Sequence, residues 1–167
     1  TYMKLGEYEL EDQIEAAKYL GSLPYVDKSR IGIWGWSFGG YMSTLCITRG
    51  ADYFSTAVAV APVTDWRYYD NIYTERYMRR PSENEEGYKA YSPLYYTDSL
   101  KGKFFLAHGL EDDNVQPQNS FQLINELVKS NKQFEMQVYT NKNHNISGGN
   151  TRYHLFRRIT DFILKNL

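Results

Sequence analysis

The residue types of a nucleophilic catalytic system occur in order along this chain. Ser37 lies in the stretch Gly35-Trp36-Ser37-Phe38-Gly39, which fits the pattern G-x-S-x-G. Acidic side chains follow at residues 111–113, and His144 comes after them. A serine hydroxyl is a poor nucleophile until a base takes its proton, and that base needs a carboxylate to fix its tautomer. The order of serine, acid and histidine therefore indicates acyl-transfer chemistry.

The serine lies where a buried strand is expected to meet a helix. The apolar run within Arg30–Gly35 predicts the strand, and the residues from Phe38 to Arg49 predict the helix. This is the setting of a nucleophile elbow, a turn so tight that we expect side chains at the flanking glycine positions to clash. The turn presents the serine at the carboxyl edge of the sheet and at the positive end of the helix. A plain glycine-rich turn is the alternative, and the strand and helix on either side favour the elbow.

The acid is less sharply defined than the serine. In this arrangement it should follow a strand, and Phe104–Ala107 predicts one immediately before the acidic loop. Spacing alone does not choose among Glu111, Asp112 and Asp113.

The chain contains three histidines, and one of them fits the base. His144 follows the predicted strand Phe134–Tyr139, which places it at the same sheet edge. His108 belongs to the acid's own loop, where we expect it to brace the acid by hydrogen bonding. His154 lies in the predicted last helix, from which we expect that it cannot reach the sheet edge.

Strand and helix patterns alternate along most of the chain. They include an amphipathic helix ending near Gly21, a continuous apolar strand at Thr56–Ala61 and a last helix spanning Leu155 to Ile163. Alternation of this kind predicts an α/β protein with an open, mostly parallel sheet covered by helices on both faces. The tyrosine-rich stretch from Val63 to Leu100 interrupts the pattern, and such insertions usually help to build the site.

Composition excludes several other classes of protein. With 42% hydrophobic and 23% charged residues, the 167-residue chain has the make-up of one globular domain. A net charge of -1 and the absence of a basic run leave no electrostatic footprint for nucleic acid. No apolar stretch reaches the roughly 20 residues that span a bilayer.

Cys46 has no disulfide partner and is expected to be an inert packed thiol. We expect no metal and no cofactor.

Several segments are similar to a known family. They are G-E-Y-E-L-E-D-Q-I-E-A-A from Gly6, I-G-I-W-G-W-S-F-G-G-Y from Ile31, A-V-A-P-V-T-D-W-R-Y-Y-D-N-I-Y-T-E-R-Y-M from Ala59, H-G-L-E-D-D-N-V from His108, and the histidine loop. Together they resemble the prolyl oligopeptidase family of serine peptidases, and most closely its dipeptidyl peptidase IV branch. The resemblance implies an α/β-hydrolase fold and extends over nearly the whole chain.

The resemblance also implies roles for individual residues. In its D-D-N-V motif the first aspartate orients the histidine, which gives a triad of Ser37, Asp112 and His144. The backbone N–H of Phe38 would contribute to the oxyanion hole, and Asn114 would hold a substrate carbonyl. The residues implied to line a compact apolar pocket for the residue before the cleaved bond are Val63, Trp66, Tyr69, Tyr73 and Val115.

The implied function is a serine exopeptidase that releases dipeptides or tripeptides after proline or alanine. An acyl esterase on the same fold and a catalytically inactive binding relative are the alternatives. We expect a peptide as the partner, no nucleic acid, a homodimer of the intact protein, and a periplasmic or cell-surface location. We also expect residues 1–167 to form one partial catalytic domain, with a β-propeller and the first strands of the hydrolase sheet before Thr1. The strand at Ile31–Trp34 would then be central, with neighbours on both sides.

The sequence departs from the family pattern at three positions. Phe38 stands where a tyrosine is common, and the effect should be mild because the backbone N–H does the work. Asn145 follows the histidine where glycine is usual, so the loop should differ in shape. Thr56 stands at the first cysteine of a disulfide found in animal relatives, which favours a bacterial source.

Overall fold

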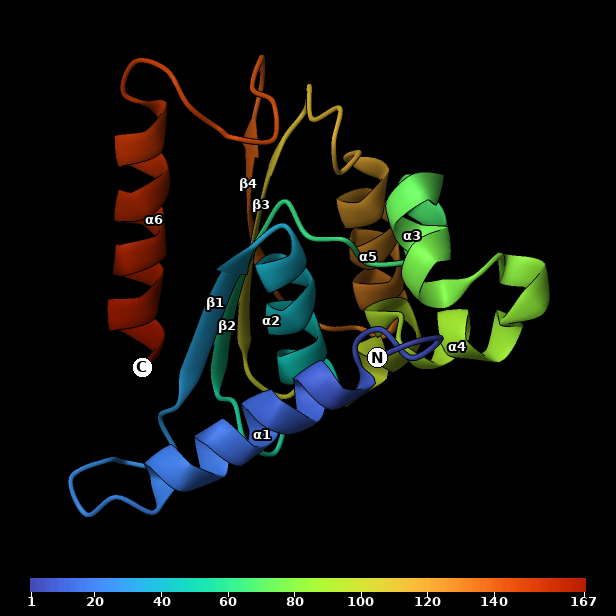
Figure 1. Cartoon of the computed structure of the whole chain (residues 1–167). Helices are drawn as coiled ribbons and strands as arrows, with labels where there is room; N and C mark the ends of the chain where they lie inside the picture. Colours follow the sequence, from blue (N-terminus) through green and yellow to red (C-terminus); the bar gives the residue numbers. More distant parts are fainter.

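A computed structural model describes all of residues 1–167. Its centre is a parallel sheet of four strands in the order β1-β2-β3-β4 (Figure 1). The strands are β1 (Gly32–Trp36), β2 (Thr56–Val60), β3 (Lys103–Gly109) and β4 (Glu135–Tyr139). Because all four run the same way, their carboxyl ends meet at one edge. The loops after β1, β3 and β4, which contain the candidate catalytic residues, all leave from that edge.

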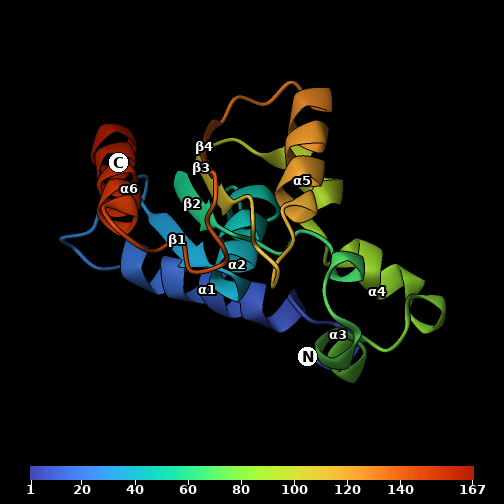
Figure 2. The same cartoon turned by 90° about the horizontal axis from the view of Figure 1, so that it is seen from above.

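Helices cover both faces of the sheet, as Figures 1 and 2 show. Helix α6 lies alone on one face, while α1, α2 and α5 lie on the other, and the insert with α3 and α4 extends away from the sheet. The helices are α1 (Glu7–Gly21), α2 (Phe38–Thr48), α3 (Asn71–Met78), α4 (Glu85–Ala90), α5 (Gln118–Lys129) and α6 (Thr151–Asn166). Short 3-10 helices span Trp66–Tyr68, Pro81–Glu83 and Pro93–Ser99.

The apolar strand sequences follow from this two-sided cover. Every residue of β2 is buried, so the strand shows no polar alternation. Side chains alternate between faces along a strand. Ala57 and Ala59 accordingly belong to the larger core with α1, α2 and α5, whereas Val58 and Val60 belong to a second core under α6. The small alanines leave room for α2, which packs directly on β1 and β2.

The predicted α/β architecture is confirmed, and each predicted strand is present within a few residues of its expected bounds. The insert is more regular than its sequence pattern indicated, because it folds into α3, α4 and three 3-10 helices. No helix is both long enough and apolar enough to cross a bilayer.

Strand β1 lies at one end of the sheet rather than at its centre. Within residues 1–167 it pairs with β2 alone, and Trp34 is 51% exposed and packs edge-on against Phe156 of α6. Within this span β1 therefore has a neighbour on one side only. That the second neighbour comes from sequence before Thr1 stays a prediction.

Candidate active site

Ser37 occupies a strained turn between β1 and α2. Its backbone φ of 60° and ψ of -118° lie outside the regions that non-glycine residues ordinarily adopt. The turn is held because the Ser37 N–H donates to the carbonyl of Val60, 2.8 Å away on β2. Ser37 is also the N-cap residue of α2. The next N–H, that of Phe38, lies in the first turn of the helix, where such groups have no intrahelical partner.

The glycines around Ser37 differ in what they permit. A Cβ at Gly35 would overlap the backbone of Gly39, and a Cβ at Gly40 would come within 2.8 Å of the Val60 carbonyl oxygen. A Cβ at Gly39 would meet no atom within 4 Å. The expectation that both flanking glycines avoid a clash is therefore right for Gly35 and wrong for Gly39. Gly39 matters here for its backbone, against which Gly35 packs.

Asp112 lies in the loop between β3 and α5, and its side chain is completely buried. Oδ1 accepts hydrogen bonds from the N–H groups of Asn114 (3.0 Å) and Val115 (2.9 Å), and Oδ2 lies 2.7 Å from Nδ1 of His144. Burial alone raises the pKa of the Asp112 carboxyl, but the hydrogen bonds from His108 and His144 outweigh it and hold that pKa below its usual value. Asp112 is thus a buried carboxylate aimed at His144.

The other two acidic candidates do not contact the histidine. Glu111 and Asp113 are both exposed, and neither forms a hydrogen bond or ion pair with His144. Of the three, Asp112 is the one that contacts His144, and the backbone N–H groups that follow it fold back onto its carboxylate.

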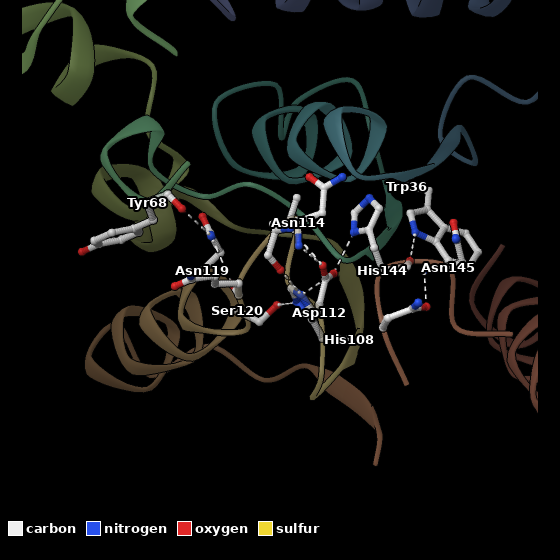
Figure 3. A network of polar contacts seen from close by, with 12 residues as sticks. Trp36, Tyr68, His108, Asp112, Asn114, Asn119, Ser120, His144 and Asn145 are labelled. Atoms are coloured by element: carbon white, nitrogen blue, oxygen red, sulfur yellow. Dashed lines mark hydrogen bonds and ion pairs between the residues drawn. The ribbon is translucent and has the colours of Figure 1, made fainter. Parts of the chain in front are cut away.

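His108 braces the acid loop, as expected from its position. It is fully buried, with Nδ1 2.6 Å from the Ser120 hydroxyl and Nε2 2.8 Å from the carbonyl of Val115. A carbonyl only accepts, so the proton is on Nε2, and Nδ1 accepts from Ser120. Nε2 also lies 3.2 Å from Oδ2 of Asp112. In Figure 3 both His108 and His144 point at Asp112.

His144 lies in the loop between β4 and α6, with 17% of its side chain exposed. Its carbonyl accepts a hydrogen bond of 2.9 Å from the indole Nε1 of Trp36, the residue before the serine (Figure 3). This bond ties the histidine loop to the elbow. No hydrogen bond joins Ser37 to His144. Such bonds are often long before substrate binds.

His154 is placed differently from the expectation. Its Nδ1 is 2.9 Å from the hydroxyl of Tyr139, the last residue of β4, because the residue lies in the first turn of α6 beside the carboxyl edge. The prediction that it cannot reach this edge is wrong. It nevertheless forms no hydrogen bond or ion pair with Asp112 or Ser37.

Aromatic residues of the insert form a cluster next to the elbow. The rings of Trp66 and Tyr73 stack at 5.7 Å with an interplanar angle of 26°, and Tyr69 packs edge-on against Tyr73 at 5.4 Å. Phe38 reaches the cluster at 6.0 Å from Trp66. The buried members of the predicted pocket are Val63, Trp66 and Val115. Tyr69 and Tyr73 are partly exposed, as is Phe38, so these three rings provide accessible surface of the cluster.

A hydrogen bond joins this cluster to the acid loop. The Tyr69 hydroxyl donates to Oδ1 of Asn114 over 2.8 Å. With its oxygen engaged, the exposed Asn114 amide presents its N–H₂ group as a donor.

Sequence reasoning missed three residues that contact the site loops. They are Trp36, Ser120 and Arg152, whose Nη2 donates to the carbonyl of Asn145 over 2.7 Å. Trp36 had a signal, since it lies inside the elbow motif, but a tryptophan there reads equally well as core. Ser120 and Arg152 had none, because their contacts form only when separate loops converge.

The parallel sheet, its helices and the serine elbow define an α/β-hydrolase fold. All of residues 1–167 match the prolyl oligopeptidase family, and the chain belongs to that family. It is 44% identical over 165 residues to a probable dipeptidyl-aminopeptidase B of Ajellomyces capsulatus, and 41% identical over 166 residues to the prolyl endopeptidase FAP of Mus musculus. These matches cover 96% and 98% of this chain but 18% and 22% of the relatives.

Two solved structures are similar over the whole chain. One is dipeptidyl peptidase 4 from Porphyromonas gingivalis, with 51% identity and a TM-score of 0.98. The other is a putative dipeptidyl aminopeptidase IV from Bacteroides ovatus, with 40% identity and a TM-score of 0.97. In each case this chain covers 24% of the solved chain. The chain thus spans about a fifth to a quarter of the length of the relatives that it matches.

Proposed function

We propose that this chain contains the catalytic triad of a serine exopeptidase that releases dipeptides, or tripeptides, after proline or alanine. The observation that supports this most strongly is the pair formed by the buried Asp112 and His144, whose Oδ2 and Nδ1 lie 2.7 Å apart at the sheet edge where Ser37 is the N-cap residue of α2. The names of the similar proteins, dipeptidyl peptidases and a prolyl endopeptidase, agree with this proposal.

Each triad residue has one task in the proposed reaction. The Ser37 Oγ attacks the carbonyl carbon of the scissile bond while Nε2 of His144 takes its proton. Asp112 accepts from Nδ1–H of His144, which fixes the tautomer and stabilises the imidazolium that forms. The same proton then passes to the leaving amine, and the C–N bond breaks to leave an acyl ester on Ser37. A water molecule, with His144 again as the base, then attacks the ester carbonyl. The ester bond breaks, which releases the acyl product and returns the Ser37 hydroxyl.

The oxyanion of the tetrahedral intermediate needs donors at the same edge. The N–H of Phe38 is suited to this task because it lies in the first turn of α2, where the helix dipole also favours negative charge. We propose that a second hydrogen-bond donor to the oxyanion comes from outside residues 1–167.

The aromatic cluster suits a proline side chain. The flat ring walls of Tyr69 and Tyr73, backed by Trp66, offer a compact apolar surface to a rigid ring without a hydrogen-bonding nitrogen. Val63 and Val115, which belong to the same core as Trp66, would close its buried side. The Asn114 N–H₂ group, oriented by Tyr69, would donate to a carbonyl of the bound peptide. We further propose a homodimer and an extracytoplasmic location for the intact protein.

Substrate comparison tests this function in the intact protein. We expect chromogenic Xaa-Pro and Xaa-Ala dipeptide amides to be cleaved, the same amides blocked at the amino terminus to be resistant, and Ser37→Ala to lose turnover by several powers of ten. Preference for simple acyl esters over all amides would indicate an esterase. Binding of the peptides without turnover by the wild-type protein would indicate an inactive relative.

A further inference from the structure

The backbone that holds His144 is tied down at two consecutive carbonyls. Trp36 of β1 donates its indole N–H to the carbonyl of His144 over 2.9 Å. Arg152 of α6 donates from Nη2 to the carbonyl of Asn145 over 2.7 Å. The two donors are far apart in the sequence and meet on one short segment (Figure 3 shows Trp36 beside His144 and Asn145).

The two donors also contact each other. The guanidinium carbon of Arg152 lies 5.4 Å from the centre of the Trp36 ring, within the range of a cation–π interaction. A planar guanidinium stacks on an aromatic face and donates in its own plane at the same time. Arg152 and Trp36 therefore form one clamp across the histidine loop, with Ser37 immediately after Trp36.

The loop needs such a clamp because its own backbone provides little regular structure. Between β4 and α6 the left-handed residues Asn141, Ile146, Gly148 and Gly149 have φ values of 55°, 43°, 97° and 54°. The paired glycines separate His144 from α6, so the helix does not fix the histidine directly. Ile146 is fully buried under α6 and anchors the far side of the loop.

The position of Arg152 is unfavourable for the helix to which it belongs. It lies in the first turn of α6, where the helix dipole disfavours a positive charge, and no acidic residue accompanies it there. An arginine at this position therefore neither stabilises the helix nor forms an ion pair. Its contacts are the Asn145 carbonyl and the Trp36 ring.

We propose that Arg152 is a positioning residue for His144, acting with Trp36 through the carbonyls of the histidine loop. The proposal rests on the proposed function, in which His144 is the base. Loss of the clamp lets the loop shift, so Nε2 of His144 spends less time in line with Ser37. The effect falls on the acylation step and leaves the aromatic pocket intact.

Steady-state kinetics of the intact protein on an Xaa-Pro amide tests the clamp. We expect Arg152→Ala to lower kcat by about 10- to 100-fold, as small misplacements of catalytic groups do, with KM changed less than 3-fold. Arg152→Lys keeps a cationic donor and should recover most of kcat. Trp36→Phe keeps the ring but removes the indole donor, and should lower kcat in the same way. The matched control is Arg157→Ala, which removes an exposed arginine of the same helix whose nearest carboxylate, Asp161, is 3.9 Å away.

Four outcomes count against the proposal. The first is a kcat for Arg152→Ala within 2-fold of wild type. The second is an equal loss of kcat in Arg157→Ala. The third is an Arg152→Ala loss that appears in KM alone. The fourth is a folded Trp36→Phe variant with wild-type kcat. Thermal melting of each variant distinguishes a loss of kcat caused by unfolding from one caused by a misplaced His144. Failure of the proposed function would look different, because His144→Ala would then retain wild-type kcat.

Discussion

Asp112 Oδ2 and His144 Nδ1 lie 2.7 Å apart although they belong to different loops, after β3 and β4. Gly109, the last residue of β3, makes this approach possible. A Cβ there would overlap the carbonyl of Lys142 and come within 2.7 Å of that of Asn143. The absence of a side chain lets the histidine loop lie across the acid loop. Backbone N–H groups on one side of Asp112 and His108 on the other then fix its carboxylate.

The first prediction concerns the tautomer of His144. Asp112→Asn keeps the size of the side chain and one oxygen that accepts from the N–H groups of Asn114 and Val115. The NH₂ group that then takes the place of Oδ2 is a donor, so it cannot accept a hydrogen bond from Nδ1–H of His144. We expect kcat to fall by about 10⁴ while the protein stays folded, the loss known for a triad histidine held in the wrong tautomer. Asp113→Asn, one residue away and exposed, should be within 2-fold of wild type. Similar kcat values for the two variants would show that Asp112 is not the acid.

The second prediction follows from the lowered pKa of Asp112. Its folded pKa lies below the value of about 3.9 for an unfolded chain, so its charge stabilises the fold above that pH, and this contribution is lost as the pH falls below about 4. The melting-temperature difference between wild type and Asp112→Asn should be no smaller at pH 5 than at pH 7. It should shrink between pH 4 and pH 3. A difference that disappears already between pH 7 and pH 5 would contradict the pKa direction.

The third prediction compares two glycines of the elbow. Gly35→Ala places a methyl group against the Gly39 backbone, so we expect a loss of about 1–3 kcal/mol or more in unfolding free energy and a displaced, inactive serine. Gly39→Ala meets no atom of this chain and should change the unfolding free energy by about 1 kcal/mol at most. Denaturant unfolding and turnover measure both effects. A tolerated Gly35→Ala would be incompatible with the described turn.

The fourth prediction concerns the hydroxyl that orients Asn114. Tyr69→Phe keeps the aromatic wall but frees the amide to rotate. One neutral hydrogen bond is worth about 0.5–1.5 kcal/mol, so we expect kcat/KM on Xaa-Pro amides to fall about 2- to 10-fold. Tyr153→Phe, which alters a tyrosine 71% exposed on α6, is the control. Tyr69→Ala should cost more, because it also removes a wall of the pocket. An unchanged kcat/KM in Tyr69→Phe would separate Asn114 from substrate binding.

Much of the fold could be predicted from the sequence because its signals are local. The apolar runs at β1, β2 and β3 and the glycines around Ser37 are contiguous patterns with one physical interpretation. The choice of Asp112 needed the family resemblance, since three neighbouring carboxylates are equivalent until the turn after Asp112 folds its N–H groups back. The contact between His154 and Tyr139 was misjudged because it depends on where α6 begins relative to β4. Trp36 and Arg152 meet only after the whole sheet and α6 have assembled.

Covalent labelling of the intact protein tests the central claim most directly. An organophosphonate that mimics the tetrahedral intermediate should form one adduct, which peptide mass spectrometry should locate on Ser37. Activity should fall in proportion to labelling, and His144→Ala should abolish the adduct because the serine then has no base. An adduct on another residue, or fully active wild-type protein that takes no label, would contradict the assignment of Ser37, Asp112 and His144 as the triad.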